Sequence, residues 1–289
     1  RGREIDSSTA KPKNLGLIRS FALKPSLMRQ KIYQIDAFTN RTFGGNPAAV
    51  CILDSWLSPE LMQKIAQENN LAETAFAVKK DDQYELRWFT PEVEVDLCGH
   101  ATLATAFVLF HFYEFEKDTI QFYSSRSGHL TVNKADNGWL TMDFPTDNLI
   151  AIQNIEELDT AIGKAPVKTL KGKTDYMMVY RSQKEIEAIE PNHHLLGQLD
   201  VRGVIVTAPG EEVDFVSRFF APACGIPEDP VTGSAHTSLT PYWTEILDKT
   251  KMTAKQLSKR GGDVVCEYLG ERVKISGKAV LYLTGEIDI

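Results

Sequence analysis

Two short segments place a glycine where a helix is expected to begin. One is Cys98–His100 (Cys-Gly-His) and the other is Thr232–Ser234 (Thr-Gly-Ser). The first turn of a helix leaves backbone N–H groups without helical partners and carries the positive end of the helix dipole, so it can hold a carboxylate or a developing oxyanion. Two such starts could grip one acidic substrate from both sides, although most helix N-termini take no part in chemistry.

Glu73 is a candidate acid or base because of its surroundings. Its neighbours Leu71, Ala72, Ala75 and Phe76 are apolar. An apolar setting raises the pKa of a carboxyl group toward neutral pH, as general acid–base catalysis requires. The alternative is an ordinary solvent-facing glutamate at a strand end, and the sequence leaves both open.

His100 and Asp229 each precede or begin a predicted helix. The helix dipole disfavours a charged imidazole in the first turn, so we expect His100 to be neutral and to exchange hydrogen bonds, either with a ligand or as a polar cap. Asp229 lies in the segment Pro-Glu-Asp-Pro just before the second helix. It could orient a ligand or simply cap that helix.

Nucleophilic chemistry has weaker support. Ser234 and His236 are two residues apart and do not share a helix face, so Ser234 is better interpreted as a hydrogen-bond donor. Cys98 is a candidate nucleophile or acid–base thiol, because a helix N-terminus lowers a thiol pKa. The matching position in the second segment is Thr232, which excludes a symmetric pair of thiols.

The elements that must position these residues follow from periodicity. Lys31–Phe38 and Ala48–Leu53 alternate as strands around a Gly-Asn-Pro turn, and Ser58 is placed to cap a helix that begins at Pro59. Gly99–Tyr113 is apolar nearly all round, which predicts a central helix enclosed by sheet.

A repeat relates the two glycine segments. Arg87–Pro91 followed by Cys98–Leu103 is similar to Arg218–Pro222 followed by Thr232–Thr237, with three more residues between proline and glycine in the second copy. Each copy predicts a strand, a proline loop, a glycine and a helix. Unless the match is a chance one, the chain forms two similar lobes whose helix starts could face each other.

Composition excludes several classes of protein. The 289 residues are 43% hydrophobic and carry a net charge of −7, which fits a large core and gives no basic face for nucleic acid or anionic membrane. The sequence has no P-loop, dinucleotide fingerprint or HExxH motif. Its four cysteines form no CxxC pair, so we expect neither a disulfide framework nor a metal site. We therefore expect the protein to work in a reducing cytoplasm. A small-molecule substrate is the default.

Two further features concern the organisation of the chain. Residues 1–27 precede the first clear strand, and we interpret them as a leader or extension outside the fold. The longest apolar stretch, Ala101–Tyr113, is shorter than the ~20 residues that cross a bilayer. A polar passage over Pro145–Asn154 is the expected domain boundary.

The ordered set of motifs resembles the PhzF family of phenazine-biosynthesis isomerases. The resemblance runs from about Met28 to the C-terminus. It rests on Asp36–Phe38 (DAF), Gly45–Val50 (GNPAAV), Glu73–Phe76 (ETAF), Cys98–Thr102 (CGHAT) and Glu228–His236 (EDPVTGSAH).

The resemblance implies the fold of diaminopimelate epimerase. That is an α+β fold with two pseudo-symmetric lobes, each a mostly antiparallel sheet curved around a central helix, and an active site between them. We expect residues 28–145 with about 279–289 in the N-terminal lobe, since the last strand of this fold returns to the first lobe, and residues 146–278 in the C-terminal lobe.

The resemblance also implies proton transfer without cofactor or metal. In the phenazine enzyme the glutamate of the ETAF motif moves a proton between carbons of trans-2,3-dihydro-3-hydroxyanthranilate. Carried over, Glu73 is the base and then the acid, on a small carboxylate-bearing substrate. The residues expected to hold that substrate are Asn46, Gly99, His100, Asp229, Gly233 and Ser234, with Cys98 and Thr232 as further candidates.

Two other functions remain open from the sequence. One is a one-base amino-acid racemase or epimerase; epimerases of this fold use two facing cysteines, and this chain offers at most one. The other is a non-catalytic ligand-binding or interaction protein on the same fold. A homodimer is expected by analogy alone.

Overall fold

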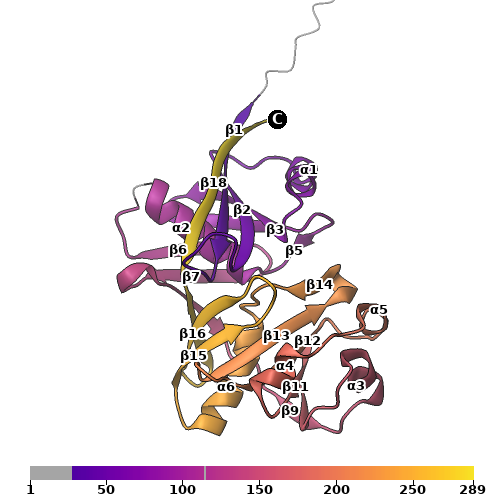
Figure 1. The fold of residues 1–289 in the computed structure, drawn as a ribbon. Helices are drawn as coiled ribbons and strands as arrows, with labels where there is room; N and C mark the ends of the chain where they lie inside the picture. The colour runs from indigo at the N-terminus through magenta and orange to yellow at the C-terminus, as the bar shows by residue number, and fades with distance from the viewer. Residues whose placement is uncertain (1–27, 114) are drawn as a thin grey trace, which may run out of the picture.

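The computed structural model describes residues 28–113 and 115–289, so the extension predicted for residues 1–27 lies outside the described part. The chain forms two lobes, one above the other in Figure 1. The N-terminal half and the last strand build the upper lobe. The segment between them builds the lower lobe.

The upper lobe is a curved sheet with strands in the order β18, β1, β2, β3, β4, β6, β7, β8. The pairs β2–β3 and β4–β6 are parallel and the other five are antiparallel. Its elements are β1 (Arg29–Ala37), β2 (Asn46–Leu53), α1 (Pro59–Asn69), β3 (Glu73–Lys80), β4 (Gln83–Phe89), β5 (Glu94–Val95), α2 (Gly99–Phe112), β6 (Thr119–Ser124), β7 (Gly128–Lys134), the 3-10 turn η1 (Asp136–Gly138), β8 (Leu140–Pro145) and β18 (Ala279–Asp288).

The lower lobe repeats this arrangement. Its strand order is β9, β10, β11, β12, β13, β15, β16, β17, and the parallel pairs β11–β12 and β13–β15 fall at the same two places. Its elements are β9 (Ile150–Ile152), α3 (Glu156–Ile162), β10 (Lys168–Lys171), β11 (Asp175–Val179), α4 (Gln183–Glu187), α5 (His193–Leu196), β12 (Gly203–Pro209), β13 (Phe215–Ala221), η2 (Pro222–Cys224), β14 (Ile226–Asp229), α6 (Ala235–Leu247), β15 (Lys251–Gln256), β16 (Gly262–Tyr268) and β17 (Arg272–Gly277). The predicted α+β fold with two pseudo-symmetric lobes is confirmed.

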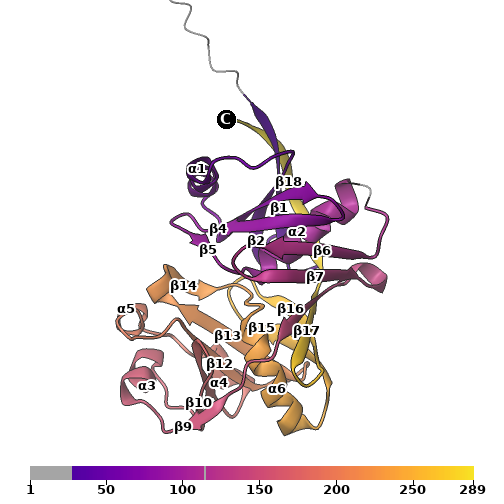
Figure 2. The same ribbon diagram turned by 180° about the vertical axis from the view of Figure 1, so that it is seen from behind.

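A central helix lies inside each sheet. α2 packs against β1, β2, β3 and β8, and nearly all of its residues up to Leu109 are buried, because it is apolar on every side. α6 packs against β15, β16 and β17 as its counterpart. Seen from behind in Figure 2, both helices lie against strands of their own lobe.

The two sheets are joined at one strand pair and around one side chain. β8 pairs with β17 across the lobes, from Arg272 opposite Pro145 to Gly277 opposite Leu140. Phe38 is fully buried at this junction with a positive φ of 62°. A Cβ atom on Gly277 would lie 2.3 Å from its ring, so only glycine fits against Phe38 there.

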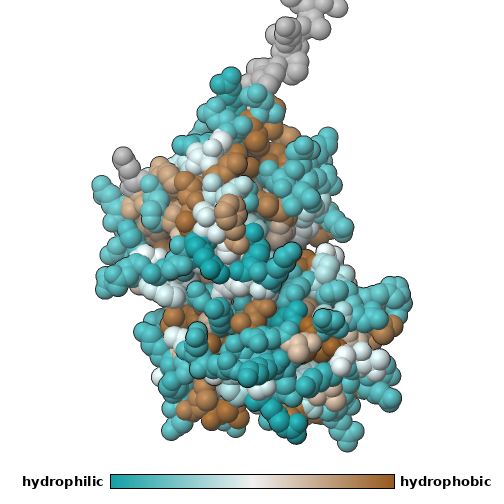
Figure 3. Space-filling model, in the orientation of Figure 1, coloured by the Kyte–Doolittle hydropathy of each residue, from teal (hydrophilic) through white to brown (hydrophobic). Residues whose placement is uncertain are grey.

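The outer surface is mixed in character. Figure 3 shows mainly hydrophilic side chains over the lower lobe and a group of apolar ones on the upper lobe, where β18 carries the exposed Tyr282 and Leu283. Among the described residues, the helices are too short or too polar to cross a membrane.

Candidate active site

Glu73 is the first residue of β3, where it pairs with Ala48 of the parallel strand β2. Its side chain is buried, with the residue only 8% exposed, so the alternative of a solvent-facing glutamate is wrong. Of the apolar neighbours that singled it out in the sequence, Ala75 and Phe76 lie in the same buried strand segment, whereas Leu71 and Ala72 precede the strand and are partly buried. β3 therefore delivers a carboxylate into the interior.

His100 faces that carboxylate from the first turn of α2. Its Nε2 lies 3.0 Å from Glu73 Oε2, and its Nδ1 lies 3.4 Å from Cys98 Sγ. The contact of Nε2 with the carboxylate is close but is not a hydrogen bond, since Glu73 Oε2 has no hydrogen-bond partner among the described residues. Nδ1 faces a thiol that can donate to it or accept from it. The three side chains form one connected polar group inside the protein.

The pKa of His100 is shifted in the direction opposite to the one expected from the helix dipole. Burial lowers its pKa, but the neighbouring Cys98 and Glu73 raise it by more, so the pKa lies well above the usual 6.5. The helix dipole acts in the opposite direction and is outweighed by a carboxylate at contact distance. His100 therefore holds its proton more strongly than the helix dipole alone would allow.

Asn46 links this group to the lower lobe. The residue is fully buried at the start of β2, and its Nδ2 donates to Asp229 Oδ1 at 2.7 Å and to the Val231 carbonyl at 3.0 Å. The same nitrogen lies 3.2 Å from His100 Nδ1. Its Oδ1 is buried without a hydrogen-bond partner among the described residues. One side chain thus connects His100 in the upper lobe to Asp229 in the lower lobe.

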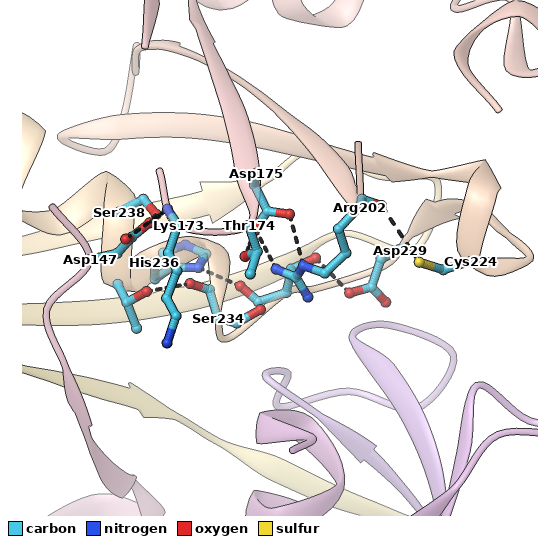
Figure 4. Close-up of polar contacts among 12 residues, drawn as sticks. Asp147, Lys173, Thr174, Asp175, Arg202, Cys224, Asp229, Ser234, His236 and Ser238 are labelled. Carbon is cyan, nitrogen blue, oxygen red and sulfur yellow. Dashed lines mark hydrogen bonds and ion pairs between the residues drawn. The ribbon is translucent and has the colours of Figure 1, made fainter. Parts of the chain in front are cut away.

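Asp229 is held by a network that the sequence did not reveal. Its Oδ2 accepts from Thr232 Oγ1 at 2.5 Å, and its carbonyl accepts from Gln256 Nε2 at 2.8 Å. Burial raises the pKa of Asp229 to about 6, and Glu73 adds to this, whereas His100 and the two hydrogen bonds to the carboxylate lower it. Figure 4 shows Asp229 and Ser234 in the lower lobe beside a separate polar cluster in which Asp147 accepts from Ser238.

The two glycine segments meet. A Cβ atom on Gly99 would lie 3.6 Å from the Gly233 Cα, so the two backbones are in near contact with no side chain between them. α2 begins at Gly99, whereas α6 begins two residues after Gly233, with Ser234 as its N-cap. Both positive helix ends therefore point at the junction of the lobes.

Cys98 does not behave as its position suggested. It is the N-cap of α2, yet burial raises the pKa of its thiol to about 11. The desolvation of a thiolate outweighs the helix N-terminus here, so Cys98 carries a proton at neutral pH and contacts His100. The candidate thiolate nucleophile is not supported.

The site is enclosed in this structure. Glu73, Cys98, His100, Asp229 and Thr232 are each between 5% and 8% exposed. A cavity of about 550 Å³ lies elsewhere, between β7, β8 and β15–β17, and none of these five residues lines it. A substrate that contacts Glu73 must therefore displace some of the groups that cover it.

Two residues around the site were missed in the sequence. Gln256 is fully buried and bonds Thr232 as well as Asp229; its signal was a glutamine on the apolar face of an alternating strand. Arg260 bonds the Asp36 carboxylate and the carbonyls of Gly44 and Gly45, which fixes the turn before Asn46. Nothing local in the sequence signals that contact across 224 positions.

Comparison with known proteins places the chain in a family. The model of the PhzC-PhzF family, described as phenazine biosynthesis-like protein, matches residues 35–285. The chain belongs to this family. An uncharacterized isomerase of Pseudomonas aeruginosa is 51% identical over 91% of this chain and 100% of its own, and a mouse phenazine biosynthesis-like domain-containing protein 1 is 41% identical over 90% and 99%.

Solved structures agree with the family assignment. A PhzF family protein of Enterococcus faecalis superposes with a TM-score of 0.87 at 47% identity, covering 90% of this chain and 99% of that one. A hydroxyproline epimerase from Agrobacterium vitis superposes with a TM-score of 0.60 at 9% identity, covering 90% and 93% of the two chains, which shows a shared fold alone. The PhzC-PhzF chain described here thus has the epimerase-like fold expected from its motifs.

Proposed function

We propose that the protein is an isomerase that moves a proton between two carbons of a small carboxylate-bearing substrate, without a cofactor, using Glu73 as its single acid and base. The observation that carries the proposal is the buried Glu73 carboxylate in contact with His100, beside the meeting point of two helix N-termini. Family relatives named isomerases support the reaction class.

The proposed first step breaks a C–H bond of the substrate. A Glu73 carboxylate oxygen takes the proton, and the electron pair moves into the conjugated system of the substrate, so that negative charge grows on an oxygen. The backbone N–H groups at the starts of α2 and α6 can stabilise this charge. His100 stabilises the carboxylate before the proton arrives.

The proposed second step returns the proton from Glu73 to a different carbon. Substrate and product then have the same composition, and the step needs no oxidant or reductant. General acid–base catalysis of this kind contributes about 10²- to 10⁴-fold, so positioning by Asn46, Asp229 and Ser234 must supply the remainder.

A one-base racemase or epimerase is the second candidate, because it would use the same carboxylate. A thiol pair is excluded for it, since Cys98 is matched by Thr232 across the junction. The two candidates differ in the product, which is a positional isomer in the first case and a stereoisomer in the second.

Proton exchange in D₂O tests the proposal. A panel of small amino and hydroxy acids, with trans-2,3-dihydro-3-hydroxyanthranilate included, is incubated with the wild type, Glu73→Gln and the surface control Glu68→Gln, and C–D formation is followed by NMR. We expect deuterium on one or more compounds with the wild type and Glu68→Gln, and at least about 10²-fold slower labelling with Glu73→Gln. Equal labelling by all three proteins would remove Glu73 from the chemistry.

A further inference from the structure

Glu73, Cys98 and His100 together offer more than a proton relay. Each contributes one potential ligand atom, and the three atoms lie within 4.8 Å of one another. All three residues are more than nine-tenths buried. We propose that this triad binds a thiophilic divalent cation of the Zn²⁺ type, and that the bound cation blocks proton transfer.

The separations suit such an ion. His100 Nε2 lies 3.0 Å from Glu73 Oε2 and 4.0 Å from Cys98 Sγ. A tetrahedral zinc with Zn–N and Zn–O near 2.0 Å and Zn–S near 2.3 Å places its nitrogen about 3.3 Å from the oxygen and about 3.5 Å from the sulfur. The two distances from His100 Nε2 therefore need to change by about 0.5 Å or less, while the carboxylate oxygen and the sulfur, which lie within 4.8 Å of each other, must close to about 3.5 Å.

The donor set decides which cations fit. One sulfur, one imidazole nitrogen and one carboxylate oxygen match the borderline-soft ions Zn²⁺, Co²⁺ and Cd²⁺, whereas Mg²⁺ and Ca²⁺ require oxygen shells. Three protein ligands leave a fourth position for water or a substrate carboxylate. The shell has the composition of an open site.

The side chain of Asn46 lies next to the His100 ring and can orient it. When Nε2 of a histidine binds a metal, its Nδ1 carries a proton that needs an acceptor. Asn46 has its amide 3.2 Å from His100 Nδ1, and its Oδ1 is buried and unpartnered among the described residues. Rotation of that amide would present Oδ1 to the Nδ1 proton at the cost of the bonds from Nδ2 to Asp229 Oδ1 and the Val231 carbonyl. Glu73 Oε2 is also buried without a hydrogen-bond partner among the described residues, so a ligand atom of the triad is itself unsatisfied.

Binding has a defined cost and consequence. The Cys98 thiol and the His100–Glu73 pair each release a proton to solvent as the metal replaces it. Glu73 is then a metal ligand and no longer accepts a substrate proton. Inhibition by the metal therefore rests on the proposed function, whereas binding of the metal does not.

Cadmium titration of the full-length protein tests binding without any substrate. A Cd²⁺–thiolate pair gives an ultraviolet charge-transfer band, so the wild type is expected to develop this band with one equivalent of metal per chain. Cys224 is an exposed free thiol, and Cys224→Ser is the matched control that keeps the band. Cys98→Ser should lose the band, and Asn46→Ala should weaken binding about 10- to 100-fold.

The opposite results overturn the site. A band that persists in Cys98→Ser, disappears in Cys224→Ser, or never forms in the folded wild type would show that the triad does not bind the metal. Circular dichroism of each variant checks that it is folded. Asn46→Ala provides a second readout in which the Cys98 thiol is intact.

Inhibition is measured separately by the D₂O exchange assay with and without Zn²⁺. We expect zinc to slow exchange by the wild type at least tenfold and to leave any residual exchange by Cys98→Ser unchanged. Inhibition that survives in Cys98→Ser would overturn the regulatory part. A cadmium band in a protein that exchanges no substrate proton would remove the proposed function and leave the metal site standing.

Discussion

In both lobes an arginine on the strand before the central helix is clamped by a glutamate on the next short strand. Arg87 Nε lies 2.7 Å from Glu94 Oε1, and Arg218 Nε lies 2.7 Å from Glu228 Oε1. Each arginine also lies over a phenylalanine two residues further along the chain. The scaffold that precedes each helix is therefore the same, and the chemistry must come from the positions that differ.

The largest difference is at the start of one strand. Thr74 pairs with Phe89 in the upper lobe and Val204 with Phe220 in the lower lobe, so the residues before them, Glu73 and Gly203, correspond. A Cβ atom at Gly203 would lie 2.2 Å from the Phe219 ring. At the position that carries the acid in the upper lobe, the Phe219 ring of the lower lobe leaves room only for glycine.

The other differences divide the work between the lobes. By the same register Asp229 stands where the upper lobe has Val95. The repeat aligns His100 with Ser234 and Cys98 with Thr232. The upper lobe thus carries the acid and its imidazole, and the lower lobe supplies hydrogen-bonding groups. Pseudo-symmetry positions the two helix starts, and its violation leaves one buried carboxylate at the strand start where strict symmetry would give two.

The pair His100 and Ser234 tests this division most strongly. His100→Gln removes the imidazole that contacts Glu73, and we expect proton exchange to fall about 10²-fold. Ser234→Ala removes one neutral hydrogen bond that we propose between this hydroxyl and the substrate, and we expect a loss of less than about tenfold. Exchange rates of both variants in D₂O provide the measurement. An equal loss for the two would contradict the division.

The buried carboxyl group of Asp229 should make the stability of the fold depend on pH. The corresponding residue of the upper lobe, Val95, cannot titrate. The pKa of Asp229 is about 6 in the fold against 3.8 in the unfolded reference, so the fold prefers the protonated acid. That contribution is complete below pH 3.8 and is lost as the pH rises through 6. Asp229→Asn should gain roughly 2–3 kcal/mol relative to wild type across this range.

Urea unfolding at a series of pH values measures this difference. Subtracting the variant from the wild type cancels the titration of the other groups. The exposed Asp263→Asn serves as the control for loss of a carboxylate. A wild-type minus Asp229→Asn difference that does not change with pH would show that the carboxyl is not desolvated.

Gly203 tests why the lower lobe has no acid. Gly203→Ala forces a methyl group against the Phe219 ring, and we expect the free energy of unfolding to fall by about 1–3 kcal/mol. Gly285→Ala on β18 is the matched control, since its Cβ would meet other atoms no closer than 3.6 Å. Its effect should stay within about 0.5 kcal/mol. Similar values for the two glycines would mean that Phe219 moves freely.

The two arginine clamps give the smallest expected difference. Arg218 also donates to the carbonyls of Ile186 and Ile189. Among the described residues, Arg87 makes no corresponding bonds to backbone carbonyls. Arg218→Ala should therefore destabilise the fold by about 1–2 kcal/mol more than Arg87→Ala. Denaturant unfolding of both variants decides, and equal losses would mean that these two carbonyls are resolvated by water.

The sequence predicted those parts of the fold that depend on local pattern. The apolar circumference of Gly99–Phe112 indicated the enclosed helix, and the similar segments around Arg87 and Arg218 indicated the two lobes. The start of α1 was predicted correctly, because Ser58 accepts from the Leu61 amide as an N-cap does. Short elements such as β9 and α5 were missed, because four residues or fewer carry no periodicity.

The site was less accessible from the sequence. Motif order suggested Glu73, His100 and Asp229, but the bond from Asn46 to Asp229 joins residues 183 positions apart and depends on the packing of two lobes. The helix dipole predicted lowered pKa values for His100 and Cys98, whereas both are raised. Burial and a contacting carboxylate decide both, and neither can be measured along a sequence.

Transfer of a hydrogen isotope within the substrate tests the central claim most directly. A substrate identified in the D₂O panel is labelled with deuterium on the donor carbon and converted in ordinary water, and the product is analysed after a single turnover. If one buried carboxylate both removes and returns the hydrogen, part of the product carries deuterium on the receiving carbon. Product that holds only solvent hydrogen at that carbon would contradict a single carrier at Glu73.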